Sequence, residues 1–146
     1  MEEIHGMKVG PTWRGIEGGQ LLGLNFNQQG IAYLQPLKSL PLRTLQALTE
    51  GGGVLDLRPL KGLPIEKLHL RGLRLWNLSP LKGMRLKELA ISLSKVSDLG
   101  PLQGMPLVSL NLAARQVKDL SALRGMPLEF LDIGGSRVTH LSPLSG

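Results

Sequence analysis

Leu99-Gly-Pro-Leu-Gln-Gly-Met-Pro-Leu-Val-Ser-Leu-Asn-Leu112 is one copy of a pattern that repeats along most of this chain. The leucine, variable residue and glycine at its centre recur every 21 residues from Leu60 to Leu144. Equivalent positions at Leu37 and Ile16 extend the series, so six units run from residue 16 to the C-terminus, with two extra residues near Gly52. Self-similarity at such a period is the signature of a solenoid of stacked repeats.

The first half of each unit alternates leucine or isoleucine with polar or small residues. Residues 86–91 read Leu-Lys-Glu-Leu-Ala-Ile, and residues 128–133 read Leu-Glu-Phe-Leu-Asp-Ile. Alternation over a short run predicts a strand with one buried face. Stacked copies about 4.8 Å apart pair their backbones and align their leucines, so that neighbouring units stabilise each other.

The second half of each unit predicts a single helical turn on the side opposite the strands. It reads Val-Ser-Asp-Leu-Gly-Pro-Leu in residues 96–102 and Val-Thr-His-Leu-Ser-Pro-Leu in residues 138–144. Ser-Pro or Gly-Pro opens such a turn because proline fixes φ and lacks an amide that would be unpaired there. The turn is short, so we expect 3₁₀ geometry. Glycines suited to the left-handed conformation then end it, at Gly62, Gly83, Gly104 and Gly125.

Composition is that of one folded domain with an aliphatic core. Of 146 residues, 42% are hydrophobic, 19% charged and only 3% aromatic. No apolar run approaches the ~18 residues of a membrane span. The chain has no cysteine, which excludes disulfides, thiol nucleophiles and thiolate metal sites, and favours a cytoplasmic location.

The net charge of +6 comes entirely from the middle of the chain. Residues 56–95 hold nine basic and three acidic side chains, whereas the flanking segments are balanced. Electrostatic attraction of a partner is therefore expected only near the central repeats.

These motifs resemble a bacterial leucine-rich-repeat family, similar to the repeat tracts appended to bacterial serine/threonine kinases and other multidomain proteins. The resemblance covers residues 16–146 and rests on Leu-x-x-Leu-x-Leu and on the Leu-Ser-Pro-Leu-x-Gly-Met-Pro connector. It implies an α/β-type repeat solenoid: a right-handed coil with a parallel β-sheet on its concave face and short 3₁₀ or extended turns on its convex face. At an inward position where the family has Asn, Cys, Thr or Ser, Ser94 and Ser136 fit, whereas Gln29, Leu73 and Arg115 do not.

The two ends of the chain are expected to differ from the middle. We divide the chain into an N-terminal cap segment, residues 1–15, and a domain of six repeats, residues 16–146. Residues 12–26 are predicted to form a hairpin that turns at Glu17-Gly18-Gly19-Gln20. No C-terminal cap is expected, so the strand at 128–133 is an open edge that predicts end-to-end self-association.

The outward strand residues form the candidate binding face. Lys67 and Arg71, on either side of His69, suit a carboxylate or phosphate, although a solvated charged face has the same pattern. Small residues further along, with Phe130 and Leu93 as apolar anchors, suit a peptide, although they also suit tight coil packing. The residues predicted to bind are Asn25, Gln46, Lys67, His69, Arg71, Asn111, Phe130 and Asp132.

A second column of polar residues repeats before each turn. Stacked carboxylates suit calcium, but the density of oxygen ligands is too low. Acceptance of backbone hydrogen bonds from the following turn is the favoured interpretation. The column consists of Tyr33, Asp56, Asn77, Asp98, Asp119 and His140.

Together these features predict a non-catalytic module that binds a protein or peptide and uses no cofactor. The histidines, His5, His69 and His140, fall on separate parts of the coil, so no metal or nucleophilic site is expected. One alternative is a nucleic-acid or anionic-surface binder that uses the basic residues 58–95. It ranks lower because no aromatic stacking platform accompanies them. The other alternative is a structural or engineered repeat scaffold without a ligand.

Overall fold

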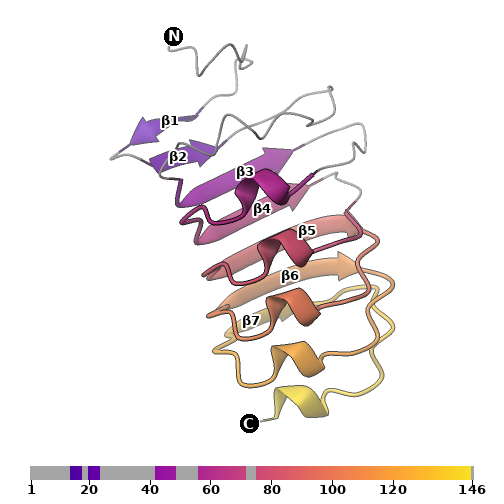
Figure 1. Cartoon of the computed structure of the whole chain (residues 1–146). Helices are drawn as coiled ribbons and strands as arrows, with labels where there is room; N and C mark the ends of the chain where they lie inside the picture. Colours follow the sequence, from indigo (N-terminus) through magenta and orange to yellow (C-terminus); the bar gives the residue numbers. More distant parts are fainter. Residues whose placement is uncertain (1–13, 18–19, 24–41, 49–55, 72–74, 146) are drawn as a thin grey trace.

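The chain is a solenoid with strands on one side and short helical turns on the other (Figure 1). A computed structural model describes residues 14–17, 20–23, 42–48, 56–71 and 75–145. Each coil passes once through the strand layer and once through the turn layer. The predicted repeat solenoid with a parallel sheet and 3₁₀ turns is confirmed.

Five parallel strands form the main sheet in the order of the sequence. Their register pairs residues one repeat apart, as in Leu68 with Leu89 and Leu110 with Leu131. Leu45 pairs with Leu68, so the two extra residues of that unit do not shift the strands relative to each other. The strands are β3 (Thr44–Leu48), β4 (Lys67–Arg71), β5 (Glu88–Ser94), β6 (Ser109–Ala114) and β7 (Phe130–Asp132).

From residue 56 onward, a 3₁₀ helix crosses the opposite side of each described coil. The glycine two residues after four of these helices has φ between 69° and 82°, a left-handed conformation that lets the chain turn back toward the strands. One helix has Ala122 where the others have proline, so proline is not required for the turn. The helices are η2 (Arg58–Leu60), η3 (Ser79–Leu81), η4 (Gly100–Leu102), η5 (Ser121–Leu123) and η6 (Ser142–Leu144).

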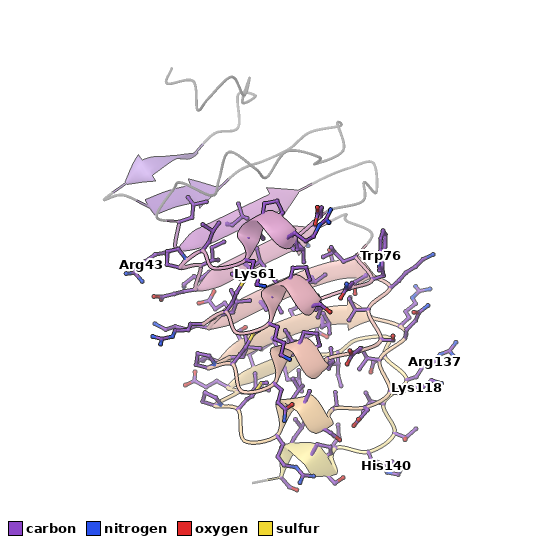
Figure 2. The ribbon with its side chains drawn as sticks, viewed as in Figure 1. Arg43, Lys61, Trp76, Lys118, Arg137 and His140 are labelled. Atoms are coloured by element: carbon purple, nitrogen blue, oxygen red, sulfur yellow. The ribbon has the colours of Figure 1, made fainter. Side chains whose placement is uncertain are left out.

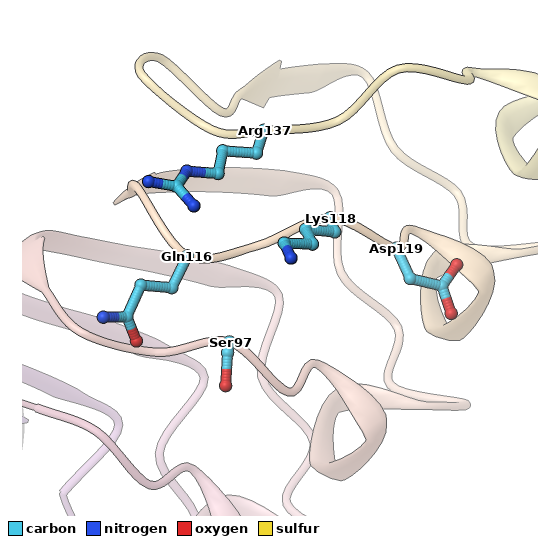
Figure 3. Close-up of a pocket in the computed structure, with 5 residues that line it drawn as sticks. All are labelled: Ser97, Gln116, Lys118, Asp119 and Arg137. Atoms are coloured by element: carbon cyan, nitrogen blue, oxygen red, sulfur yellow. The ribbon is translucent and has the colours of Figure 1, made fainter.

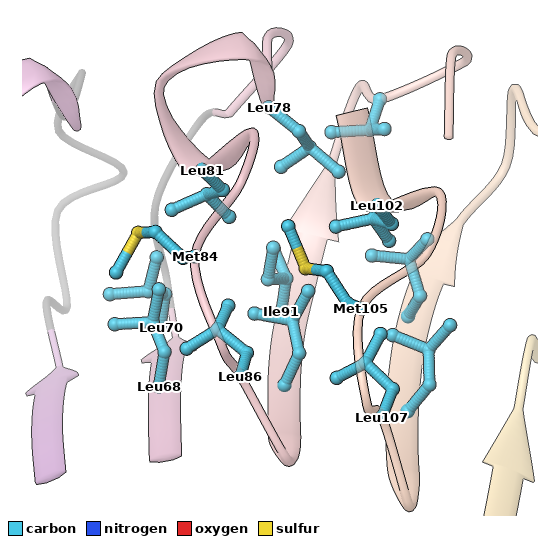
Figure 4. Close-up of a cluster of buried hydrophobic side chains, with 14 of the residues drawn as sticks. Leu68, Leu70, Leu78, Leu81, Met84, Leu86, Ile91, Leu102, Met105 and Leu107 are labelled. Atoms are coloured by element: carbon cyan, nitrogen blue, oxygen red, sulfur yellow. The ribbon is translucent and has the colours of Figure 1, made fainter. Parts of the chain in front are cut away.

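Aliphatic side chains fill the space between the two layers (Figure 4). Leu68 and Leu70 point inward from β4, Leu81 points inward from η3, and Met84 lies between them. The central coils contribute equivalent buried positions, so the core is one continuous column of aliphatic side chains, most of them leucines. Such burial, at about 25 cal/mol per Å² of apolar surface, is what makes thin coils stable.

Polar side chains accept a backbone hydrogen bond at the start of four described turns, as the favoured interpretation predicted. Oδ1 of Asp98 accepts the backbone N–H of Gly100 at 2.7 Å, and Oδ1 of Asp119 accepts that of Ser121 at 2.9 Å. Asp56 and Asn77 accept equivalent bonds at 2.9 and 2.8 Å. Tyr33 lies outside the described residues, and His140 has no carboxylate or amide oxygen to play this part.

A hairpin precedes the sheet. β1 (Arg14–Glu17) pairs antiparallel with β2 (Gln20–Gly23), and Glu17 lies opposite Gln20. β2 contacts β3. The predicted hairpin is confirmed, and it includes residue 16, where the boundary between cap and repeats was placed. The division at that residue stays a prediction. In the described part of the chain, no helix has the length and apolar character needed to cross a membrane.

Candidate functional site

The strand face, meaning the outward-facing residues of β3 to β7, is the candidate site. Alternation along β4 buries Leu68 and Leu70 and turns Lys67, His69 and Arg71 outward. The register of the sheet aligns the outward residues into rows that cross the strands. One row contains Gln46, His69, Ala90, Asn111 and Asp132, and a second contains Thr44, Lys67, Glu88, Ser109 and Phe130.

Seven of the eight predicted binding residues therefore lie on one face. Gln46, Lys67, His69 and Arg71 occupy its N-terminal part, whereas Asn111, Phe130 and Asp132 occupy its C-terminal part. The eighth, Asn25, is outside the described residues. Rows of side chains on paired strands are held by the backbone hydrogen bonds, so their spacing of about 4.8 Å per strand is fixed before a partner arrives.

The N-terminal part of the strand face is ion-paired. Nζ of Lys67 lies 2.6 Å from Oε1 of Glu88, and Nε2 of His69 lies 3.7 Å from the other oxygen of Glu88. The positive charge predicted at Lys67 is therefore offset by its neighbour on β5. Arg71 is exposed and forms no ion pair with any residue that the structure describes.

A second ion-pair cluster ties three coils together beside the strands. Oε2 of Glu66 accepts a 2.9 Å hydrogen bond from Nζ of Lys87, and Oε1 of Glu66 pairs with Arg43. The hydrogen bond from Lys87 is the main reason that the pKa of Glu66 is lowered. The sequence held a signal for this cluster, since Arg43, Glu66 and Lys87 are each one unit apart. Counting charges along the chain missed it because the pairs form across coils.

The C-terminal part of the strand face combines small side chains with an exposed aromatic ring. Ala90, Ser109 and Ala113 are half-buried, and the Phe130 side chain is 53% exposed. Nδ2 of Asn111 donates a 3.2 Å hydrogen bond to Asp132, whose other oxygen accepts the backbone N–H of Gly134 at 2.9 Å. These two bonds hold the carboxylate of Asp132 in place, two residues along β7 from Phe130. The side chain of Leu93, the second predicted anchor, is outside the described residues.

Two further features of the described residues bear on function. Among these residues, no group of three or more histidine, aspartate or glutamate side chains lies close enough to hold a metal ion. Trp76 is also exposed, with 58% of its surface accessible. It lies outside the strand face, at the edge of the molecule where Figure 2 also places Lys118 and Arg137.

Comparison with known proteins supports the architecture. No family model matches the chain, and no curated protein is detectably similar to it. A crystal structure of an internalin from Listeria monocytogenes aligns with a TM-score of 0.70 and 26% sequence identity. The alignment covers 84% of this chain and 37% of the internalin chain, so the chain spans little more than a third of that protein's length. The chain is a leucine-rich-repeat solenoid, an architecture that generally serves protein interaction.

Proposed function

We propose that the chain is a non-catalytic module that binds a protein or peptide through the strand face. The observation that carries the proposal is the exposure of Phe130, which is 53% accessible on a strand held in place by β6. Aromatic side chains supply much of the binding energy at interfaces. A ring on a paired strand also loses little conformational freedom when a partner covers it.

The residues around Phe130 leave room for a partner. Ser109 precedes it in its row, and Ala90 and Asn111 lie in the neighbouring row. With such small side chains, a partner can approach the sheet closely and still bury the ring. The amide of Asn111 and the carboxylate of Asp132 offer hydrogen-bonding groups at the margin of this apolar contact.

Arg71 is the second residue of the strand face that we expect to bind the partner. Its guanidinium forms no ion pair within the described residues, and a guanidinium suits a carboxylate through two parallel hydrogen bonds. β4 and β7 are separated by three strand spacings, roughly 15 Å. We therefore infer a partner segment that presents an acidic residue and an apolar residue about this far apart.

A peptide selection tests the proposal. Peptides selected against the wild-type chain from a displayed library are measured by fluorescence anisotropy with three variants. Phe130→Ala and Arg71→Glu should weaken binding roughly tenfold or more. Trp76→Ala is the matched control, because Trp76 is equally exposed but lies outside the strand face. Equal binding by the wild-type, Phe130→Ala and Arg71→Glu chains would overturn the proposal.

The nucleic-acid alternative draws less support from the charges of the central repeats. Lys67 and Lys87 are each paired with a carboxylate, which lowers the positive potential available to a phosphate backbone. That alternative requires affinity for DNA or RNA that falls steeply with salt. If the chain is a scaffold without a ligand, the peptide selection should yield no peptide whose binding depends on Phe130 or Arg71.

Self-association is a second proposal, carried by the last described coil. Leu78, Leu99 and Leu120 are buried, whereas Leu141, at the same position of the last coil, is 62% exposed. In the described part of the chain, β7 pairs only with β6. A second copy of the chain that covered this coil would bury Leu141 and pair the free edge of β7.

A further inference from the structure

A lateral face lies beside the strand face, where the chain leaves each strand. There the coils pair again: the backbone N–H of Lys95 donates to the carbonyl of Leu75 at 2.7 Å, and that of Arg137 donates to Val117 at 2.9 Å. Val96 and Val117 point inward and are fully buried. The residues on either side of these valines are therefore turned outward, in two columns with the 21-residue step. The lateral face consists of Lys95, Gln116 and Arg137 in one column and Ser97, Lys118 and Thr139 in the other.

An open groove of about 440 Å³ runs across this face, lined by Ser97, Gln116, Lys118, Asp119 and Arg137. Figure 3 shows the Lys118 ammonium directed toward the space among Arg137, Gln116 and Ser97. The Asp119 carboxylate points away from that space, toward η5. There it accepts the backbone N–H of Ser121 at 2.9 Å and the hydroxyl of Ser121 at 2.6 Å. The one carboxylate that lines the groove is therefore hydrogen-bonded to the turn and does not face the space between the cations.

The cations that line the groove are not neutralised by a neighbouring carboxylate. Arg43, Arg58, Lys67 and Lys87 are each paired with a carboxylate. Lys95, Lys118 and Arg137 are exposed and form no ion pair with any residue that the structure describes. Other exposed cations, such as Arg71, Lys61 and Arg124, likewise form no ion pair with a described residue, but Lys118 and Arg137 are the two that line the groove.

We propose that Ser97, Gln116, Lys118 and Arg137 form a binding site for the phosphate group of a phosphate monoester. The guanidinium of Arg137 offers parallel N–H donors, and the ammonium of Lys118 adds a compact charge. The amide of Gln116 and the hydroxyl of Ser97 supply neutral donors. A phosphate dianion has three acceptor oxygens for these donors, whereas a carboxylate has two and carries half the charge. The site is separate from the strand face and does not depend on the function proposed for it.

Titration of the labelled chain with phenyl phosphate, followed by two-dimensional NMR, tests the site. The largest shifts are expected at the amides of 116–118 and 137, and the double variant K118A/R137A should bind roughly tenfold or more weakly. K61A/R124A is the matched control, because it removes two exposed cations that form no ion pair within the described residues. Benzoate should bind more weakly than phenyl phosphate. Binding of phenyl phosphate should also weaken as pH falls below about 6, where the dianion gains a proton.

Several outcomes would overturn the site. They are equal loss of affinity in the two double variants, shifts spread over all basic residues, and equal affinity for benzoate. A phosphoserine peptide and its unphosphorylated form distinguish the possible sources of the phosphate. Tighter binding of the phosphopeptide than of phenyl phosphate supports the site and assigns it to a protein partner. Equal binding supports the site and assigns it to a small phosphate ester.

Discussion

The hydroxyl of Ser121 donates a 2.6 Å hydrogen bond to Oδ1 of Asp119, and the backbone N–H of Ser121 donates to the same oxygen at 2.9 Å. The two bonds lower the pKa of Asp119, the hydroxyl contributing most. Asp98 and Asn77 hold the equivalent backbone bond in neighbouring coils, which makes this contact a repeated device for starting the turn. Among the turns after Asp119, Asp98 and Asn77, a hydroxyl bond is found only at Asp119.

The lowered pKa of Asp119 predicts acid sensitivity. A carboxyl whose pKa is lower in the folded chain than in the unfolded chain stabilises the fold fully above the unfolded value of 3.8, and this stabilisation is lost as pH falls through the folded value. Ser121→Ala removes the larger cause and keeps the backbone bond, so the pKa of Asp119 should rise toward 3.8. NMR titration of the Asp119 carboxyl carbon in the two chains measures the change. An unaltered pKa in Ser121→Ala would contradict the role assigned to the hydroxyl.

Equivalent leucines in different coils should differ in what they contribute. Leu110 is fully buried in β6, which has a neighbour on each side, whereas Leu131 pairs with it from β7 and is half-buried. Leu110→Ala should lower the free energy of unfolding by about 2–5 kcal/mol, and Leu131→Ala by less. Urea denaturation followed by circular dichroism gives both values. Equal losses would mean that the coils do not depend on neighbours on both sides.

Most of the fold was predictable because its determinants are periodic. The 21-residue step fixes which strands pair, and alternation in residues such as Leu68 and His69 fixes which side chains face outward. Ion pairs between coils were not predicted, because the charges were counted in order along the chain and not at equivalent positions of neighbouring repeats. Glu88 beside Lys67 and Lys87 beside Glu66 emerge only when the register is applied. The lateral groove was missed for the same reason, since its residues come from three successive coils.

Ser94 illustrates a feature that the sequence does not predict. It is buried, and its hydroxyl has no hydrogen-bond partner among the described residues. The register between β5 and β6 shifts between Ile91 and Ser94, a local irregularity that no repeat pattern encodes.

The buried Ser94 hydroxyl, which has no hydrogen-bond partner in the part of the chain that the structure describes, predicts a stabilising substitution. Burying a hydroxyl without a partner costs about 1–3 kcal/mol, so Ser94→Ala should unfold at the same or a higher urea concentration than the wild-type chain. Ser136→Ala, two units further along, serves as the control because Ser136 is less buried and should change little. The urea concentrations at the unfolding midpoints of the wild-type chain and the two variants measure the effect. A clear loss of stability in Ser94→Ala would show that the hydroxyl does have a partner in solution.

Exposure of Leu141 predicts association between copies of the chain. The equivalent Leu120 is 1% exposed because the next coil covers it, and Leu141 is 62% exposed, so a second copy that covers the last coil recovers this burial. Sedimentation velocity should show a fraction of dimer that increases with protein concentration. Leu141→Lys should remain monomeric, because a charge on that surface opposes burial. Trp76→Lys should dimerise like the wild-type chain, since Trp76 lies on an earlier coil. A wild-type chain that stays monomeric at the highest concentrations, or a Leu141→Lys chain that dimerises normally, would exclude this interface.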